Sequence, residues 1–80
     1  MKLLDITKPY KVIISTNVDL EDITIHLAFV TEHYDTAGGY VFIYNTEKSA
    51  QLDMNYLMRY VKEIKEEDIE IVQFSFNELF

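Results

Sequence analysis

The sequence predicts an α+β fold in which one helix packs on one face of a mostly antiparallel four-stranded sheet, in the order β-β-β-α-β. Three observations predict it: short segments that alternate or are rich in β-branched residues, a glycine pair between two of them, and one long segment with apolar residues at helical spacing. With 80 residues, the chain is expected to form a single domain, residues 1–80.

The first three strands are predicted from β-branched residues and from alternation. Residues 10–16 (YKVIIST) follow Pro9, which favours an extended start. Residues 23–34 (ITIHLAFVTEHY) alternate along their whole length, and residues 40–45 (YVFIYN) form the third strand. One face of this strand pair is then wholly aliphatic or aromatic, and its members are Ile23, Ile25, Leu27, Phe29, Val41 and Ile43.

The turn DTAGG joins the second and third strands. Its aspartate in first place and its glycine in fourth place are typical of a type I turn, and a left-handed glycine completes a three-residue loop with a bulge. This loop places Asp35 opposite Gly39 and Tyr34 opposite Tyr40, and it requires a positive φ at Gly38. A two-residue Gly38-Gly39 turn is the alternative, which would shift the register by one and mix the two faces.

Residues 49–65 are predicted to form the helix, with Ser49 as its N-cap. Its apolar stripe lies within about 80° of arc and consists of Ala50, Met54, Leu57, Val61 and Ile64. Leu57 and Val61 should pack on the aliphatic face, against Ile25, Leu27 and Phe29. Residues 69–76 (IEIVQFSF) alternate again and form the last strand. If successive elements reverse direction, this strand is parallel to the first, and the crossover should be right-handed.

The second face of the sheet carries the main functional prediction. One helix covers one face, so the other should expose Val30, Tyr34, Tyr40, Phe42 and Tyr44. An exposed patch of tyrosine and phenylalanine usually marks a contact with another molecule. The alternative is that apolar residues near the termini cover this face, and these are Leu3, Leu4, Ile6, Leu79 and Phe80.

Charge is concentrated in one part of the chain. There are 14 acidic and 7 basic residues, for a net charge of −7. The span from Val12 to Glu47 contains six acids and no Lys or Arg. This disfavours direct binding to nucleic acid or to an anionic membrane, and it favours a protein partner with a basic surface. The alternative is that the charge serves only solubility.

No residue pattern indicates catalysis, a metal or a cofactor. His26 and His33 are seven residues apart on one predicted strand, so they point to opposite faces and cannot share a metal. Residues 17–22 resemble half of a calcium loop, but Asp22 stands where the loop needs glycine and Ala28 where it needs a distal glutamate. Nucleophile, P-loop and dinucleotide motifs are absent from the sequence. The chain is therefore expected not to be an enzyme.

The sequence favours a small acidic protein-binding module. Its concrete form would be an inhibitor of a basic nucleic-acid-binding enzyme by charge mimicry, as is common among small acidic anti-defence proteins of mobile elements such as phages. The expected partner-binding residues are Asp19, Glu21, Asp22, Glu32, Tyr34, Asp35, Tyr40 and Tyr44. The alternative is an obligate homodimeric structural or accessory subunit that buries the tyrosine-rich face. A cytoplasmic location is expected, because Asp5 interrupts the apolar start and no apolar run approaches about 20 residues.

Overall fold

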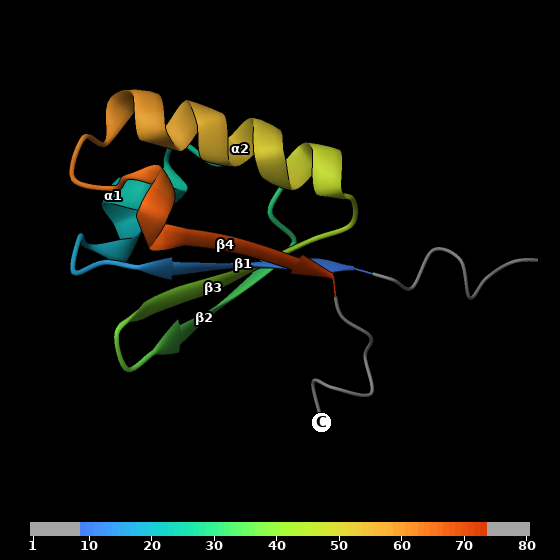
Figure 1. Cartoon of the computed structure of the whole chain (residues 1–80), viewed down its shortest axis with the longest axis horizontal. Helices are drawn as coiled ribbons and strands as arrows, with labels where there is room; N and C mark the ends of the chain where they lie inside the picture. Colours follow the sequence, from blue (N-terminus) through green and yellow to red (C-terminus); the bar gives the residue numbers. More distant parts are fainter. Residues whose placement is uncertain (1–8, 74–80) are drawn as a thin grey trace, which may run out of the picture.

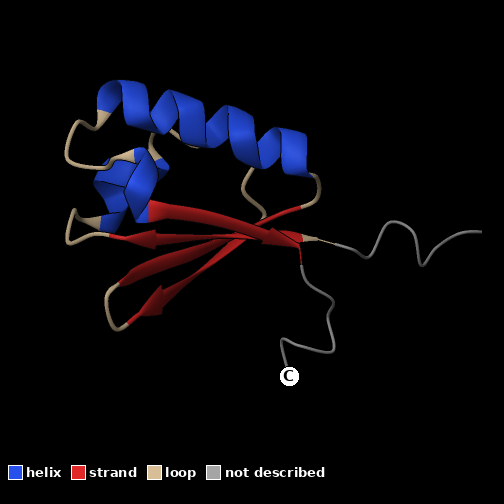
Figure 2. Cartoon of the chain, in the orientation of Figure 1, coloured by secondary structure: helices blue, strands red, loops and turns tan. Residues whose placement is uncertain are grey.

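The computed structural model describes residues 9–73. Its elements are β1 (Tyr10–Ser15), α1 (Leu20–Thr24), β2 (Glu32–Thr36), β3 (Gly39–Tyr44), α2 (Glu47–Tyr60), the short 3-10 helix η2 (Glu66–Asp68) and β4 (Ile69–Gln73). The four strands form one sheet in the order β2-β3-β1-β4, and α2 lies along one face of it (Figures 1 and 2). The predicted α+β class, with one main helix on a four-stranded sheet, is confirmed.

All neighbouring strands of the sheet are antiparallel. The prediction that β4 runs parallel to β1 is therefore wrong. The cause is α1, which inserts a crossover between β1 and β2 and so lets these two strands run in the same direction with β3 between them. The resulting order is that of the split β-α-β arrangement, with its first helix reduced to five residues.

The predicted second strand, residues 23–34, is wrong for residues 23–31. Residues Leu20–Thr24 form α1, and the chain becomes a strand only at Glu32. Two periodic patterns share Ile23: the alternation that continues to Ile25, and the helical spacing Leu20, Ile23, Leu27. The second pattern prevails. Ile23 is fully buried and Leu20 and Leu27 pack beside it, while Ile25 is 73% exposed.

The β2–β3 hairpin has a two-residue loop, Ala37-Gly38. Thr36 pairs with Gly39, one position away from the predicted register. Neither glycine has a positive φ, so the prediction for Gly38 is also wrong. Gly39 is instead required by a close approach, because a Cβ built on it would lie 1.8 Å from the carbonyl oxygen of Ile14 in β1.

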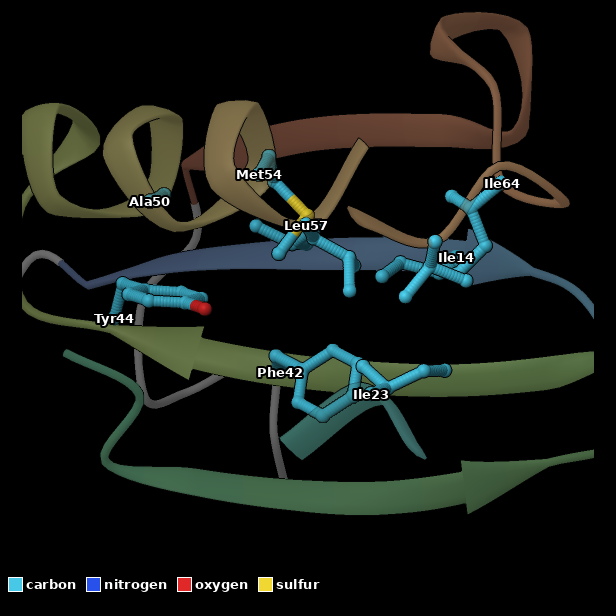
Figure 3. Close-up of a cluster of buried hydrophobic side chains, with 10 residues drawn as sticks. Ile14, Ile23, Phe42, Tyr44, Ala50, Met54, Leu57 and Ile64 are labelled. Atoms are coloured by element: carbon cyan, nitrogen blue, oxygen red, sulfur yellow. The ribbon is translucent and has the colours of Figure 1, made fainter. Parts of the chain in front are cut away.

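The two faces of β3 are the reverse of those predicted. Tyr40, Phe42 and Tyr44 lie on the side that faces α2, and Phe42 pairs with the buried Val12 of β1. Phe42 and Tyr44 are fully buried beneath the helix (Figure 3). The prediction that these rings are exposed on the open face is wrong, because the pairing of β3 with β1 places Phe42 and Tyr44 on the same face as the buried Val12.

Helix α2 begins earlier and ends earlier than predicted. The side chain of Thr46 caps it by accepting a hydrogen bond from the backbone N–H of Ser49 at 3.1 Å. The helix ends at Tyr60 rather than at Lys65. Acidic side chains are frequent in the segment 63–68 that follows, and such charges are unfavourable near the negative end of a helix.

The core lies between α2 and the sheet. Leu57 and Val61 are buried, as predicted, but their expected neighbours Ile25 and Phe29 are exposed. The core is a cluster contributed by α2, β1, β3, α1 and the segment after α2 (Figure 3). Its buried members are Val12, Ile14, Ile23, Phe42, Tyr44, Ala50, Met54, Leu57, Val61 and Ile64.

Replacing Leu57 by alanine should destabilise the fold by about 2–5 kcal/mol, because its fully buried side chain leaves a cavity between α2 and the sheet. The matched control is Leu52→Ala on the same helix, where Leu52 is 48% exposed and the change should cost about 0.5 kcal/mol or less. Urea denaturation of both variants measures the difference. Equal midpoints would contradict the assigned orientation of α2.

Two predictions concern residues outside the described range 9–73. One is the continuation of the last strand through Phe74 to Phe76, and the other is the cover of a sheet face by Leu3, Leu4, Ile6, Leu79 or Phe80. Within residues 9–73, none of the helices is long and apolar enough to span a membrane.

Candidate protein-binding surface

Exposed apolar side chains gather where the loop 25–29 meets α2. We call this surface the aromatic patch, and its members are Ile25, His26, Phe29, Leu52, Tyr56 and Tyr60. All except His26 are large hydrophobic residues with exposed fractions between 48% and 73%. Large apolar side chains that are exposed together, rather than scattered singly, usually mark a contact surface.

The helical half of the patch follows from spacing. Leu52, Tyr56 and Tyr60 recur at every fourth residue, so they form a stripe along α2 that is separate from the core-facing stripe. The two tyrosines read in the sequence as a widening of the core stripe. The structure places them outside the core instead, 48% and 53% exposed.

Three rings of the patch contact one another. His26 stacks on Tyr60 with ring centroids 5.5 Å apart and an interplanar angle of 7°. Tyr56 completes the group, at 5.9 Å from His26 and 4.6 Å from Tyr60. Offset and tilted ring pairs at such distances are mutually attractive, so the loop and the helix present one continuous aromatic surface.

Asp53 anchors the loop to the helix from beneath. Among residues 9–73, it is the one charged residue that is buried, with 3% of its surface exposed. Its carboxylate accepts hydrogen bonds from the backbone N–H groups of Ala28 and Phe29, at 3.0 Å each, and from the Tyr44 hydroxyl at 2.9 Å. Burial raises the pKa of Tyr44, and its hydrogen bond to Asp53 raises it further.

Sequence reasoning missed Asp53, although a signal for it was present. Asp53 stands three residues after Ala50 and four before Leu57, which puts it at the edge of the core-facing stripe of α2. An acid at such a position must find donors, because a buried polar group without a partner is costly. Here the donors are two backbone amides 24 and 25 residues away in the sequence, and a tyrosine nine residues away.

A groove runs between the loop and α2. Its volume is about 450 Å³, and Ile25, Phe29, Leu52 and Tyr56 form much of its wall. Asp53 also lines it, beside the backbone amides that it holds. The groove therefore combines an apolar and aromatic wall with one buried carboxylate.

The five acidic residues predicted to bind a partner are all exposed, but they do not form one cluster. Asp19 occupies the N-cap position of α1 without a capping hydrogen bond from its side chain, and Glu21 and Asp22 lie in the first turn. Glu32 and Asp35 belong to β2. Glu21 and Glu32 line the same groove, of about 400 Å³, between α1 and β2. Asp35 lines a different one at the hairpin end.

The three predicted tyrosines have different environments. Tyr34 is 41% exposed on the open face, and its hydroxyl donates to the Glu32 carboxylate, which raises the pKa of Tyr34. Tyr40 is half-buried, and its hydroxyl donates to the carbonyl oxygen of Val18 at 2.7 Å. Tyr44 is fully buried and bonded to Asp53, so it is not part of any surface.

His26 and His33 are not on one strand as predicted, because His26 lies in the loop after α1 and His33 in β2. Across residues 9–73, no group of three or more His, Asp or Glu side chains is placed to hold a metal ion.

Comparisons of the chain with protein-family models, curated proteins and solved structures find no match. What the surface binds is therefore inferred from its own chemistry.

Proposed function

We propose that the chain is a small non-catalytic protein-binding module whose contact surface is the aromatic patch. The observation that carries the proposal is the exposure of Ile25, Phe29, Leu52, Tyr56 and Tyr60 on one side of the molecule, at 48–73% each. Tyrosine and other aromatic residues are enriched in interfaces and among the residues that dominate binding energy. The two tyrosines already contact each other through their rings, which reduces the conformational entropy that their side chains lose on binding.

The proposed partner has a basic surface. The net charge of −7 and the span 12–47 without Lys or Arg support this, as do the exposed acids on α1 and β2. Such charges accelerate encounter with a basic protein more than they hold the complex together. An inhibitor that occupies the nucleic-acid groove of a basic enzyme, in the manner of anti-defence proteins of mobile elements, is the specific form of this proposal.

The alternative homodimer needs a surface other than the tyrosine-rich face of β3. Tyr44 is buried and Tyr40 is half-buried on the side that faces α2, so neither ring is available to a second copy. A homodimer through the aromatic patch would still hide exposed apolar area. Light scattering separates the two functions, because a binding module is expected to be a monomer in the absence of its partner.

Replacing Tyr56 or Tyr60 by alanine should weaken partner binding about tenfold or more, mainly by faster dissociation, because each exposed ring would anchor the contact. A partner is first identified by cross-linking in a host lysate and is then purified. Surface plasmon resonance measures its affinity and dissociation rate for each variant. Tyr34→Ala is the matched control, because Tyr34 has a similar exposure of 41% but lies on β2, outside the patch.

The same measurement tests the acidic residues. Changing Glu21 and Asp22 to lysine should slow association and reduce its salt dependence, with little change in dissociation. A partner whose affinity falls with Tyr34→Ala and not with Tyr56→Ala would contradict the assignment of the surface. If a partner binds nucleic acid and this chain at the same time, and its affinity for this chain is independent of salt, the proposal of charge mimicry is wrong. The proposal of a protein-binding module would still stand.

A further inference from the structure

Building on the proposed binding role of the aromatic patch, we infer that the groove between the loop 25–29 and α2 receives an arginine side chain of the partner, flanked in the partner by apolar residues. The groove has the three features that such a side chain requires. It has aromatic walls, a buried carboxylate, and apolar residues along its rim.

The walls suit a guanidinium group. Phe29, Tyr56 and His26 all line the groove, and the His26 ring lies 5.9 Å from that of Tyr56. A guanidinium is planar and weakly hydrated, so it stacks on such rings better than the compact ammonium of lysine does. Ile25 and Leu52, 73% and 48% exposed, extend the apolar rim for the neighbours of the arginine.

The carboxylate supplies the charge. The donors that Asp53 accepts from within residues 9–73 are two backbone amides and one tyrosine hydroxyl, all neutral. The Ala28 N–H contacts both carboxylate oxygens, so the carboxylate is well hydrogen-bonded, but within the described range it has no opposite charge beside it. Burial of a carboxylate without an opposite charge is unfavourable. A cation that enters the groove would compensate this charge in surroundings where water screens it weakly.

The surrounding charges favour the same occupant. The loop wall belongs to the span 12–47, which contains no Lys or Arg. On α2, Arg59 is the basic residue nearest the stripe of Leu52 and Tyr56. At 100° per residue it lies about 20° beyond Leu52, on the side away from Asp53, and it does not line the groove.

The test uses the full chain and peptides of known sequence. Random dodecapeptides displayed on phage are selected on the wild-type chain and counter-selected on Tyr56→Ala, with Ile25→Ser as a second patch variant. An enriched peptide is then synthesised in three forms that carry arginine, lysine or citrulline at one position. Citrulline keeps the shape of arginine and removes its charge. Affinity is measured by calorimetry, and the backbone amide signals of Ala28 and Phe29 are followed by NMR.

The expected result is that patch-dependent peptides share an arginine next to apolar residues. Citrulline should then weaken binding about tenfold, with lysine between the two. The amide signals of Ala28 and Phe29 should shift with the arginine form and much less with the citrulline form. Patch-dependent peptides without a basic residue, or equal affinity of the arginine and citrulline forms, would overturn the arginine site and leave the proposed function intact. Failure to obtain any patch-dependent peptide would overturn both.

Discussion

Replacing Gly39 by alanine should destabilise the fold by at least about 3 kcal/mol, a large part of the total stability of a small domain. A Cβ at this position would lie 1.8 Å from the carbonyl oxygen of Ile14, 2.9 Å from its carbonyl carbon and 3.0 Å from the backbone nitrogen of Thr16. These are backbone atoms, so no side-chain rotation can relieve the clash. Relief requires β1 and β3 to separate where Ser15 pairs with Gly39.

Gly38→Ala is the matched control for this prediction. A Cβ at Gly38 would meet no heavy atom within 4 Å, and its φ is not positive. Its substitution should therefore change stability by about 0.5 kcal/mol or less, or stabilise slightly by reducing the freedom of the unfolded chain. Thermal and urea unfolding measure both variants. If Gly38→Ala proves the more damaging of the two, the hairpin register described above is wrong.

Replacing Asp53 by alanine should destabilise the fold by about 3–5 kcal/mol, because three donors lose their acceptor at once. The Tyr44 hydroxyl would remain buried without a partner, and the amides of Ala28 and Phe29 would lose the bonds that hold their loop to α2. Urea denaturation measures the loss of stability. In addition, the substitution should increase the hydrogen-exchange rates of the Ala28 and Phe29 amides more than those of other amides in the fold.

Two further variants separate the parts of this effect. Asp53→Asn keeps one acceptor oxygen and should fall between the wild type and the alanine variant. Tyr44→Phe removes one donor and should cost about 1 kcal/mol. Because Tyr44 and Asp53 share a hydrogen bond, their double mutant should cost less than the sum of the single ones. Strict additivity would show that the carboxylate and the phenol act independently.

Much of the sheet could be predicted because its signals are local. The run Val12, Ile13, Ile14 marks β1, and the stripe of Ala50, Met54 and Leu57 marks α2. Residues 20–27 could not be assigned in the same way, because Ile23 fits both an alternating and a helical pattern. A short segment of this kind is decided by what its apolar residues pack against, and that depends on the rest of the chain.

The faces of the sheet and the candidate surface depend on long-range pairing. Alternation in β3 defines two sets of residues, but only its pairing with β1 decides that Phe42 and Tyr44 face the helix. The same holds for Tyr56 and Tyr60, whose spacing fits a wide core stripe as well as a second, exposed one. Asp53, an acid at the edge of the core-facing stripe of α2, was the local sign that this edge must meet hydrogen-bond donors.

The position of β1 in the middle of the sheet has a consequence for synthesis and self-association. β1 is made before either of its neighbours: Val12 pairs with Phe42, 30 residues later, and with Ile71, 59 residues later. Until β4 is made, one side of a strand rich in valine and isoleucine has unpaired backbone groups. Other chains can extend such an edge into an aggregate. β4 therefore completes the four-stranded sheet and also closes the edge of β1 that is most prone to unwanted pairing during synthesis.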